Sequence, residues 1–286
     1  MTNPEVSVII PAYNEAAVIA ITVKRIIELY PEYEVLVVDD GSSDETAAEA
    51  EQAGARVHRH PYNIGNGAAV KNGIRYARGK YVLMMDGDGQ HNPDNIAEFV
   101  IAAKKYDLVV GARQSGSQAS LGRSLANRVY NRLARYVTRF PIEDLTSGMR
   151  IFKRDTVLHF LYLFPNSFSY PTTSTLAYLR SGLTLKYLPI DAAPRVGKSK
   201  IKIVQDGVRF LLLILKITTL YSPLRVFLPV SGAFLFTGFG YYLYTYITIG
   251  RFTNMSALML STAVMIFLLG LVSEQITQTR YDRVEF

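Results

Sequence analysis

The chain has 286 residues, a formal net charge of +7, an apolar content of 49% and a positive mean hydropathy. It contains no cysteine, which excludes disulfides, thiolate metal sites and a cysteine nucleophile. The length allows one large domain with an appendage and the apolar content favours membrane contact, while the positive charge indicates anionic partners such as phosphates, acidic lipids or nucleic acid.

The first 115 residues alternate short apolar runs with amphipathic segments, which predicts an α/β fold with a mostly parallel sheet. Helix 44–53 is expected to begin with a capping box, formed by Ser42 or Ser43 ahead of Glu45 or Thr46, and Pro93 falls in the first turn of helix 93–104. Neither a dinucleotide-binding glycine motif nor a P-loop motif is present. The predicted strands are 6–10, 35–38, 55–58, 81–85 and 108–112, and the predicted helices are 15–29, 44–53, 67–77 and 93–104.

Polar residues follow the predicted strands, at the sheet edge where open α/β sheets bind their ligands. Gly67, at the start of helix 67–77, offers backbone N–H groups to a phosphate, although an ordinary helix start explains it equally well. An Asp-Gly-Ser sequence such as 40–42 is also a common turn. The candidate ligand-binding residues after the first two strands are Pro11, Tyr13, Asn14, Glu15, Asp39 and Asp40.

Asp86 and Asp88 place two carboxylates directly after the apolar run 81–85. Magnesium and manganese prefer oxygen ligands, and one or two carboxylates usually hold them together with substrate phosphates. An acidic turn that merely ends the strand is the alternative. Because acidic or glycine-rich sequences recur at several strand ends, the pattern favours a site for a metal and a diphosphate.

Arginines recur at helical spacing after the fifth strand, in a stretch from 113 to 142 that contains no acidic residue. If this stretch is a helix, they share one face. A solvated face is the ordinary explanation of such a run, but the missing acidic partners favour an acidic membrane surface or a lipid phosphate. The residues are Arg128, Arg132, Arg135 and Arg139.

The C-terminal third predicts membrane segments. Residues 201–225 read as an amphipathic helix lying in the interface, and the runs 226–249 and 256–272 have the length of transmembrane helices. Between residues 226 and 279 the only charged side chains are Arg251 and Glu274. The positive-inside rule then predicts a two-span membrane protein whose catalytic domain and both termini are cytoplasmic, and the tyrosines 241, 242, 244 and 246 suit an interfacial belt. The expected parts are a catalytic domain 1–200, a juxtamembrane helix 201–225, a transmembrane hairpin 226–279 and a tail 280–286.

Four segments, 8–15, 37–44, 65–70 and 85–91, resemble the family 2 glycosyltransferases of GT-A fold in their order and spacing. The likeness covers roughly residues 6–200 and is greatest to the dolichyl-phosphate mannose synthase branch and its bacterial polyprenyl-phosphate relatives. It implies a membrane-bound inverting enzyme that moves a hexose from a GDP- or UDP-linked sugar to dolichyl or undecaprenyl phosphate with Mg²⁺ or Mn²⁺. The sugar and the nucleotide stay open.

The resemblance also implies roles for individual residues. Asp39 or Asp40 reads the nucleoside, Asp86 lies near the ribose and the metal, and Asp88 with Gln90 ligates the metal. Gly87 departs from the usual alanine without affecting metal binding. Asp144 either orients a sugar hydroxyl or the lipid phosphate, or caps a helix. The implied acceptor-phosphate residues are Arg113, Arg123, Arg128, Arg195, Ser199 and Lys200, and the implied catalytic residues are Asp88, Arg113, Arg123 and Asp144.

Three other functions were weighed. A processive polysaccharide synthase resembles the N-terminal half but uses a Gln-x-x-Arg-Trp motif and a larger channel, whereas this chain has no tryptophan and two predicted spans. The intact Asp86, Asp88 and Gln90 argue against a catalytically silent membrane partner on the same fold. Nucleic-acid binding is not expected, because the basic residues cluster beside the membrane segments. A homo-oligomer is left open.

Overall fold

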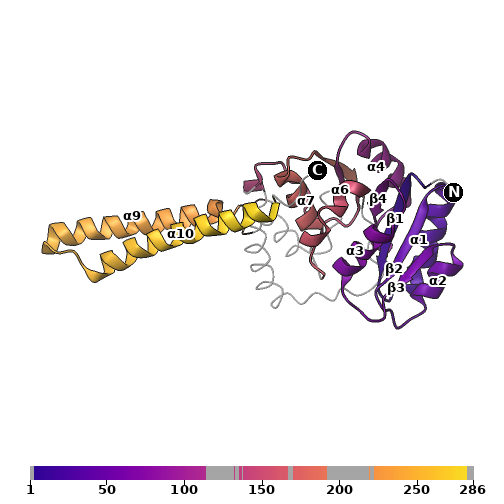
Figure 1. Cartoon of the computed structure of the whole chain (residues 1–286), viewed down its shortest axis with the longest axis horizontal. Helices are drawn as coiled ribbons and strands as arrows, with labels where there is room; N and C mark the ends of the chain where they lie inside the picture. Colours follow the sequence, from indigo (N-terminus) through magenta and orange to yellow (C-terminus); the bar gives the residue numbers. More distant parts are fainter. Residues whose placement is uncertain are drawn as a thin grey trace. The chain divides into compact units, whose positions relative to one another are not determined.

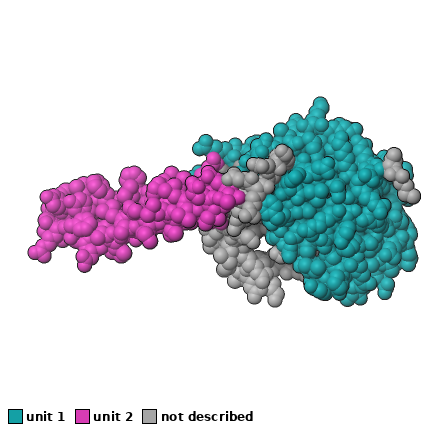
Figure 2. Space-filling view, in the orientation of Figure 1, with its two compact units in different colours: residues 1–201, 286 teal, residues 202–285 magenta. Residues whose placement is uncertain are grey.

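The computed structural model describes residues 3–113, 132, 135–136, 138–166, 170–191, 219 and 222–281 (Figure 1). The chain divides into two compact units, residues 1–201 with Phe286 and residues 202–285, which Figure 2 colours separately. Each unit is considered by itself.

The first unit is built on a seven-stranded sheet in the order β3-β2-β1-β4-β6-β5-β7. β6 runs antiparallel to both of its neighbours, and the other pairs are parallel. The mostly parallel α/β sheet is therefore confirmed, although β6 and β7 were not predicted. The strands are β1 (Val6–Ala12), β2 (Glu34–Asp39), β3 (Arg56–Arg59), β4 (Tyr81–Met84), β5 (Leu108–Arg113), β6 (Arg150–Lys153) and β7 (Leu185–Ile190).

Helices cover both faces of this sheet, which is why β1 and β4 are buried throughout and read as continuous apolar runs. α1 (Ala16–Leu29), α2 (Thr46–Gln52) and α4 (Ile96–Ala103) share one hydrophobic core with alternate residues of β1 such as Val8 and Ile10. α3 (Asn66–Tyr76) covers the other face, where the backbone of Gly73 approaches Ile9 closely (Figure 1). α6 (Arg154–Leu158), η2 (Leu161–Leu163) and α7 (Tyr170–Arg180) follow β6, and the ring of Tyr178 of α7 packs at a tilt against Phe152 of β6.

The strand register brings the candidate site residues together. Ala12 at the end of β1 lies opposite Asp39 at the end of β2, and Asp39 lies opposite Arg59 at the end of β3. Ile9 lies opposite Met84, so the residues that follow β4 continue beside the end of β1. The carboxyl ends of four parallel strands thus meet at one edge.

Three local predictions were wrong. No capping box forms at α2, because the Ser42 hydroxyl accepts a hydrogen bond from Asn14 N instead, and Asp44 accepts from Thr46 N. Helix 93–104 is divided, since Pro93 begins the short 3₁₀ helix η1 (Pro93–Asn95) ahead of α4. Arg139 does not continue a helical face, because its backbone is left-handed with φ 57°.

The second unit is a hairpin of two long helices, α9 (Leu224–Ile249) and α10 (Asn254–Tyr281). Small residues let the helices approach: a Cβ on Gly238 would lie 2.8 Å from that of Met259, and one on Gly270 would lie 2.7 Å from that of Phe227. The Ser231 hydroxyl crosses the interface to the Ala263 carbonyl at 2.8 Å.

Both helices are long and apolar enough to cross a membrane: Leu224–Ile249 has a hydropathy of 1.4 and Asn254–Thr279 one of 2.3. Only 11% and 17% of these apolar stretches are buried inside the unit, so their large apolar side chains need another apolar environment. The prediction of two apolar C-terminal helices able to span a membrane is confirmed, and α10 extends well beyond the predicted end at 272.

Candidate active site

The loop after β1 is joined to the segment after β2 by several hydrogen bonds. Asn14, in a left-handed conformation with φ 56°, donates its N–H to the Ser42 hydroxyl at 2.9 Å and accepts from Ser43 N at 2.9 Å through its side chain. Glu15 N donates to the Thr46 hydroxyl at 2.9 Å, and Ala16 N donates to Asp44. These bonds fix the rim of the site, so Asn14 serves here by shaping the loop.

The two adjacent aspartates after β2 differ sharply in their surroundings. Asp40 is buried and both of its carboxylate oxygens are hydrogen-bonded: Oδ1 pairs with His60 Nδ1 at 2.7 Å and accepts from Ile64 N at 3.0 Å, and Oδ2 accepts from Gly65 N at 2.8 Å. The amide nitrogen of Asn72 lies 2.8 Å from His60 Nε2, so the imidazole proton resides on Nδ1 and points at Asp40. Asp40 therefore holds the β3–α3 loop.

One carboxylate oxygen of Asp39 accepts no hydrogen bond. Its Oδ1 accepts from Ser42 N at 3.0 Å, whereas its buried Oδ2 has no hydrogen-bond partner and only an ion pair with Arg59 Nε at 3.1 Å. Arg59 donates to the Ser42 carbonyl at 2.9 Å. Beside this group lies a cavity of about 310 Å³, lined by Gly41, Ser42, Arg59, His60 and Pro61. Of the two aspartates, Asp39 is the one with a carboxylate oxygen that accepts no hydrogen bond.

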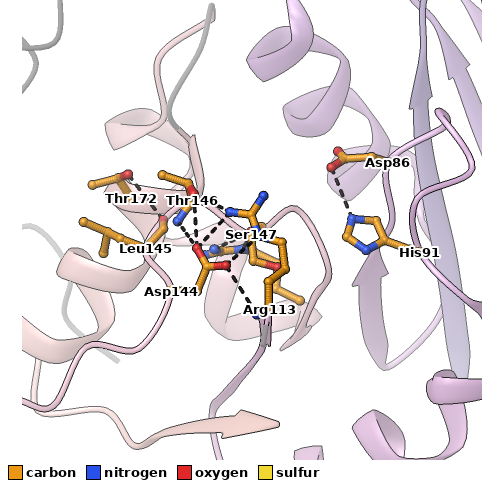
Figure 3. Close-up of polar contacts among 9 residues, drawn as sticks. Asp86, His91, Arg113, Asp144, Leu145, Thr146, Ser147 and Thr172 are labelled. Atoms are coloured by element: carbon orange, nitrogen blue, oxygen red, sulfur yellow. Dashed lines mark hydrogen bonds and ion pairs between the residues drawn. The ribbon is translucent and has the colours of Figure 1, made fainter. Parts of the chain in front are cut away.

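Asp86, just beyond β4, lies against the backbone of Gly148. A Cβ on Gly148 would lie 2.1 Å from Asp86 Oδ2, so only glycine leaves room for this carboxylate. His91 Nε2 lies 3.3 Å from the same oxygen, and its Nδ1 is buried without a partner in the described part of the chain (Figure 3). Desolvation works against ionisation of Asp86, but His91, Arg113 and Arg150 outweigh it and hold its pKa below the ordinary value.

Asp88 and Gln90 lie on a tight turn two residues further on. Gly89 takes φ 74°, which folds the chain back so that Gln90 N donates to Asp88 Oδ1 at 3.2 Å. In the described residues no three His, Cys, Asp or Glu side chains gather closely enough to hold a metal ion unaided. Two carboxylates and an amide oxygen do fit Mg²⁺ or Mn²⁺ when substrate phosphates complete the shell. Asp86, Asp88 and Gln90 are the side chains that would hold it.

Arg113 at the end of β5 forms a two-pronged ion pair with Asp144 (Figure 3). Its Nε donates to Oδ2 at 2.7 Å and its Nη2 to Oδ1 at 3.1 Å, while Nη2 also donates to the Thr146 hydroxyl at 2.6 Å. Desolvation opposes both charges, but the pairing lowers the pKa of Asp144 and raises that of Arg113. Asp144 caps no helix, so that alternative was wrong, and its low pKa and occupied oxygens make it a poor general base.

The remaining predicted site residues have mixed outcomes. Pro11 is buried within β1, Tyr13 is 40% exposed on the rim, and Gly67 is buried in the first turn of α3. Next to Gly67, Ala68 N already donates to the Asn166 carbonyl at 2.9 Å. Five residues lie outside the described residues: Arg123, Arg128, Arg195, Ser199 and Lys200.

Sequence reasoning gave no role to His91, Thr146 or Gly148. The partners of Thr146 and Gly148 lie in other segments of the chain: Gly148 meets Asp86 and Thr146 meets Arg113. Residue spacing within one segment cannot predict a contact between two residues from different segments.

Comparisons with known proteins agree with this geometry. The model of the family described as glycosyl transferase family 2 matches residues 7–160, and the model described as the GtrB C-terminal hairpin matches residues 222–279. Glycosyltransferase AglJ of Haloferax volcanii is 30% identical over 256 residues, which cover 85% of this chain and 82% of that protein. The undecaprenyl-phosphate 4-deoxy-4-formamido-L-arabinose transferase of Pectobacterium carotovorum is 29% identical over 245 residues, covering 82% of this chain and 73% of that protein.

A solved structure shares the fold of the first unit. Glucosyl-3-phosphoglycerate synthase from Mycobacterium tuberculosis, crystallised with Mn²⁺ and uridine-diphosphate-glucose, matches with a TM-score of 0.59 at 20% identity. The match covers 74% of this chain and 79% of that one. At this identity it shows the fold alone.

Proposed function

Because the chain belongs to glycosyl transferase family 2, we propose that it transfers a hexose from a GDP- or UDP-linked sugar to a polyprenyl phosphate such as dolichyl or undecaprenyl phosphate. The observation that carries this proposal is that one chain joins a family 2 domain to two helices able to span a membrane. A lipid acceptor would be held in the bilayer that the hairpin enters. A related transferase is named for undecaprenyl phosphate, which supports the same acceptor class.

The donor would bind along the ends of β1, β2 and β4. Asp39 has the acceptor capacity to read the nucleoside beside the 310 Å³ cavity, whereas both carboxylate oxygens of Asp40 are already hydrogen-bonded. Pro11, Tyr13, Asn14, Glu15 and Gly67 complete the proposed nucleotide-sugar site. Asp86, Asp88 and Gln90 would hold Mg²⁺ or Mn²⁺, which when bound neutralises the diphosphate and its developing charge. A relative in fold was crystallised with Mn²⁺.

The acceptor would bind next to Arg113, with Arg123, Arg128, Arg195, Ser199 and Lys200 as further proposed contacts. A lipid monophosphate is largely a dianion at neutral pH, so its oxygen attacks without a general base. That oxygen forms a bond to the anomeric carbon as the bond to the nucleoside diphosphate breaks, and the configuration inverts. The protein must reduce the repulsion between the two phosphate groups, which is the work of fixed cations such as Arg113.

The proposed location is a membrane, with two spans and with the catalytic unit and both termini in the cytoplasm. Arg225 lies in the first turn of α9, Arg280 lies in the last turn of α10 and Arg283 follows that helix, while Arg251 is the only charged residue in the connecting turn. Nucleotide sugars are made in the cytosol, so donor and catalytic unit would share a compartment.

The test incubates the full chain in membranes with a panel of labelled GDP- and UDP-sugars, with and without polyprenyl phosphate. We expect label in the lipid fraction for one donor, only with added acceptor and a divalent ion. Asp88→Ala should lose this transfer, whereas Asp155→Ala, at a side chain 97% exposed, should keep it. Label that enters a polysaccharide, or no transfer with any donor, would refute the proposal.

A further inference from the structure

Arg150, the first residue of β6, is a charged side chain with no exposure at all. Its backbone lies opposite Met84 of β4 and Val110 of β5, at the level where those strands approach the site. It is the largest of the fully buried side chains in the described part of the chain. No role was assigned to it from the sequence.

Neutral oxygens alone accept the hydrogen bonds found for this guanidinium. Nε and Nη2 donate to the Ser147 carbonyl at 3.1 and 2.7 Å. Nη1 donates to the Pro171 carbonyl at 2.7 Å and to the hydroxyls of Ser174 and Thr175 at 2.8 and 3.2 Å. Arg150 therefore ties the loop before β6 to the first turns of α7.

Burying a cation without a hydrogen-bonded carboxylate costs several kcal/mol. A neutral donor such as glutamine could also hydrogen-bond to these carbonyls, at a lower desolvation cost. The hydrogen bonds by themselves therefore do not explain why the buried side chain is charged. The carboxylates that interact electrostatically with Arg150 are Asp144 and Asp86. Both belong to the candidate active site.

The loop that Arg150 holds, residues 144–149, contains residues that contact Asp86 and Arg113 of the candidate active site. Between Asp144 and Arg150, Gly148 leaves room for the Asp86 carboxylate and accepts a hydrogen bond from the Tyr170 hydroxyl at 3.2 Å. Asp144 starts the loop and orients Arg113 (Figure 3). A shift of the Ser147 carbonyl would thus move partners of both Asp86 and Arg113.

We propose that Arg150 is a positioning residue of the transferase: its guanidinium fixes the 144–149 loop, and its charge places a permanent cation behind Asp86 and Asp144. This inference rests on the proposed function. The buried cation does not touch substrate. It favours the negative charge that develops on the departing nucleoside diphosphate, and the protein does not reorganise during transfer to provide it.

The experiment compares Arg150→Lys, which keeps the charge but loses the fork, with Arg150→Met, which loses both. Arg154→Met is the matched control, because Arg154 lies at the start of α6 and donates to the Arg75 carbonyl, away from the site. For each purified full-length variant, sugar transfer to polyprenyl phosphate, release of nucleoside diphosphate and the melting temperature are measured together.

We expect kcat to fall about 100-fold in Arg150→Met and about 10-fold in Arg150→Lys, since one missing preorganised electrostatic group costs about 100- to 1000-fold when it contacts the substrate. KM for both substrates should change less than about threefold, because the charge acts mainly on the transition state. Arg154→Met should match the unaltered chain.

Equal losses in the Lys and Met variants, a kcat in Arg150→Met close to that of the unaltered chain, or losses that simply follow the melting temperature would overturn the inference. If the unaltered chain does not glycosylate polyprenyl phosphate, the proposed function fails by itself. In that case the rate at which each variant releases nucleoside diphosphate from the sugar donor is compared instead, and the same outcomes support or overturn the role of Arg150.

Discussion

The pairing of Arg113 with Asp144 leads to a prediction about how Asp144 acts. If Asp144 serves only to orient and balance Arg113, Asp144→Asn should lower activity in the unaltered chain and have almost no further effect when Arg113 is already Met. If Asp144 were instead a general base, its loss would matter in both backgrounds. A double-mutant cycle separates the two roles.

The size of the effect follows from the geometry. The pair has two charge-assisted hydrogen bonds, at 2.7 and 3.1 Å, and each such bond contributes about 1.5–3 kcal/mol. Arg113 is 26% and Asp144 9% exposed, so solvent screening reduces the sum to about 2–3 kcal/mol. If all of it is lost from the transition state, Asp144→Asn lowers kcat about 30- to 150-fold. In the Arg113→Met background the further loss should stay below about threefold.

The assay is the initial rate of label transfer to saturating polyprenyl phosphate at neutral pH, for the four chains of the cycle. The pKa of Asp144 is lowered, so its carboxylate is ionised under these conditions and the pair is formed. Melting temperatures exclude a trivial loss of folded protein. Equal fold-losses from Asp144→Asn in the two backgrounds would refute the orienting role.

Two further changes test the packing and the electrostatics. Gly148→Ala should push the Asp86 carboxylate aside, because the new Cβ would lie 2.1 Å from its oxygen, and so lower transfer at least about tenfold with little change in melting temperature. Gly87→Ala is its control and should stay active, since its Cβ would lie 3.2 Å from the Pro11 carbonyl oxygen, a tight contact that a much smaller displacement relieves; equal losses in both variants would contradict the argument. Desolvation of Asp107 opposes its charge, but hydrogen bonds from Lys153 and Thr184 outweigh it and lower its pKa, so its stabilisation is present above pH about 4 and is lost as the pH falls through the lowered value. Asp107→Asn should therefore lower the melting temperature at pH 7, and the difference should disappear once the pH falls below the lowered pKa of Asp107; a pH-independent difference would show that its charge is not involved.

Local patterns were sufficient for the sheet's first five strands and for the two apolar helices. Runs such as 6–12 and 81–84 are buried on both faces, so they are apolar at nearly every position, Ser7 being the exception, and 226–249 is apolar for longer than a soluble helix requires. β6 and β7 were missed because they pair with a sheet whose order is set by distant neighbours. β6 also lacks an apolar run that would predict a strand, because Arg150 and Lys153 occupy its two ends.

The sequence by itself determined the chemistry at the sheet edge: which strand ends carry carboxylates, and that an apolar hairpin follows. Only the tertiary structure decided how those groups are used. Asp39 and Asp40 are neighbours in sequence, but adjacent side chains at the end of a strand point in opposite directions, so Asp40 meets His60 and Asp39 keeps an oxygen that accepts no hydrogen bond. Gly148 gained its importance from Asp86 in the same way, through a contact between segments that are far apart in the chain.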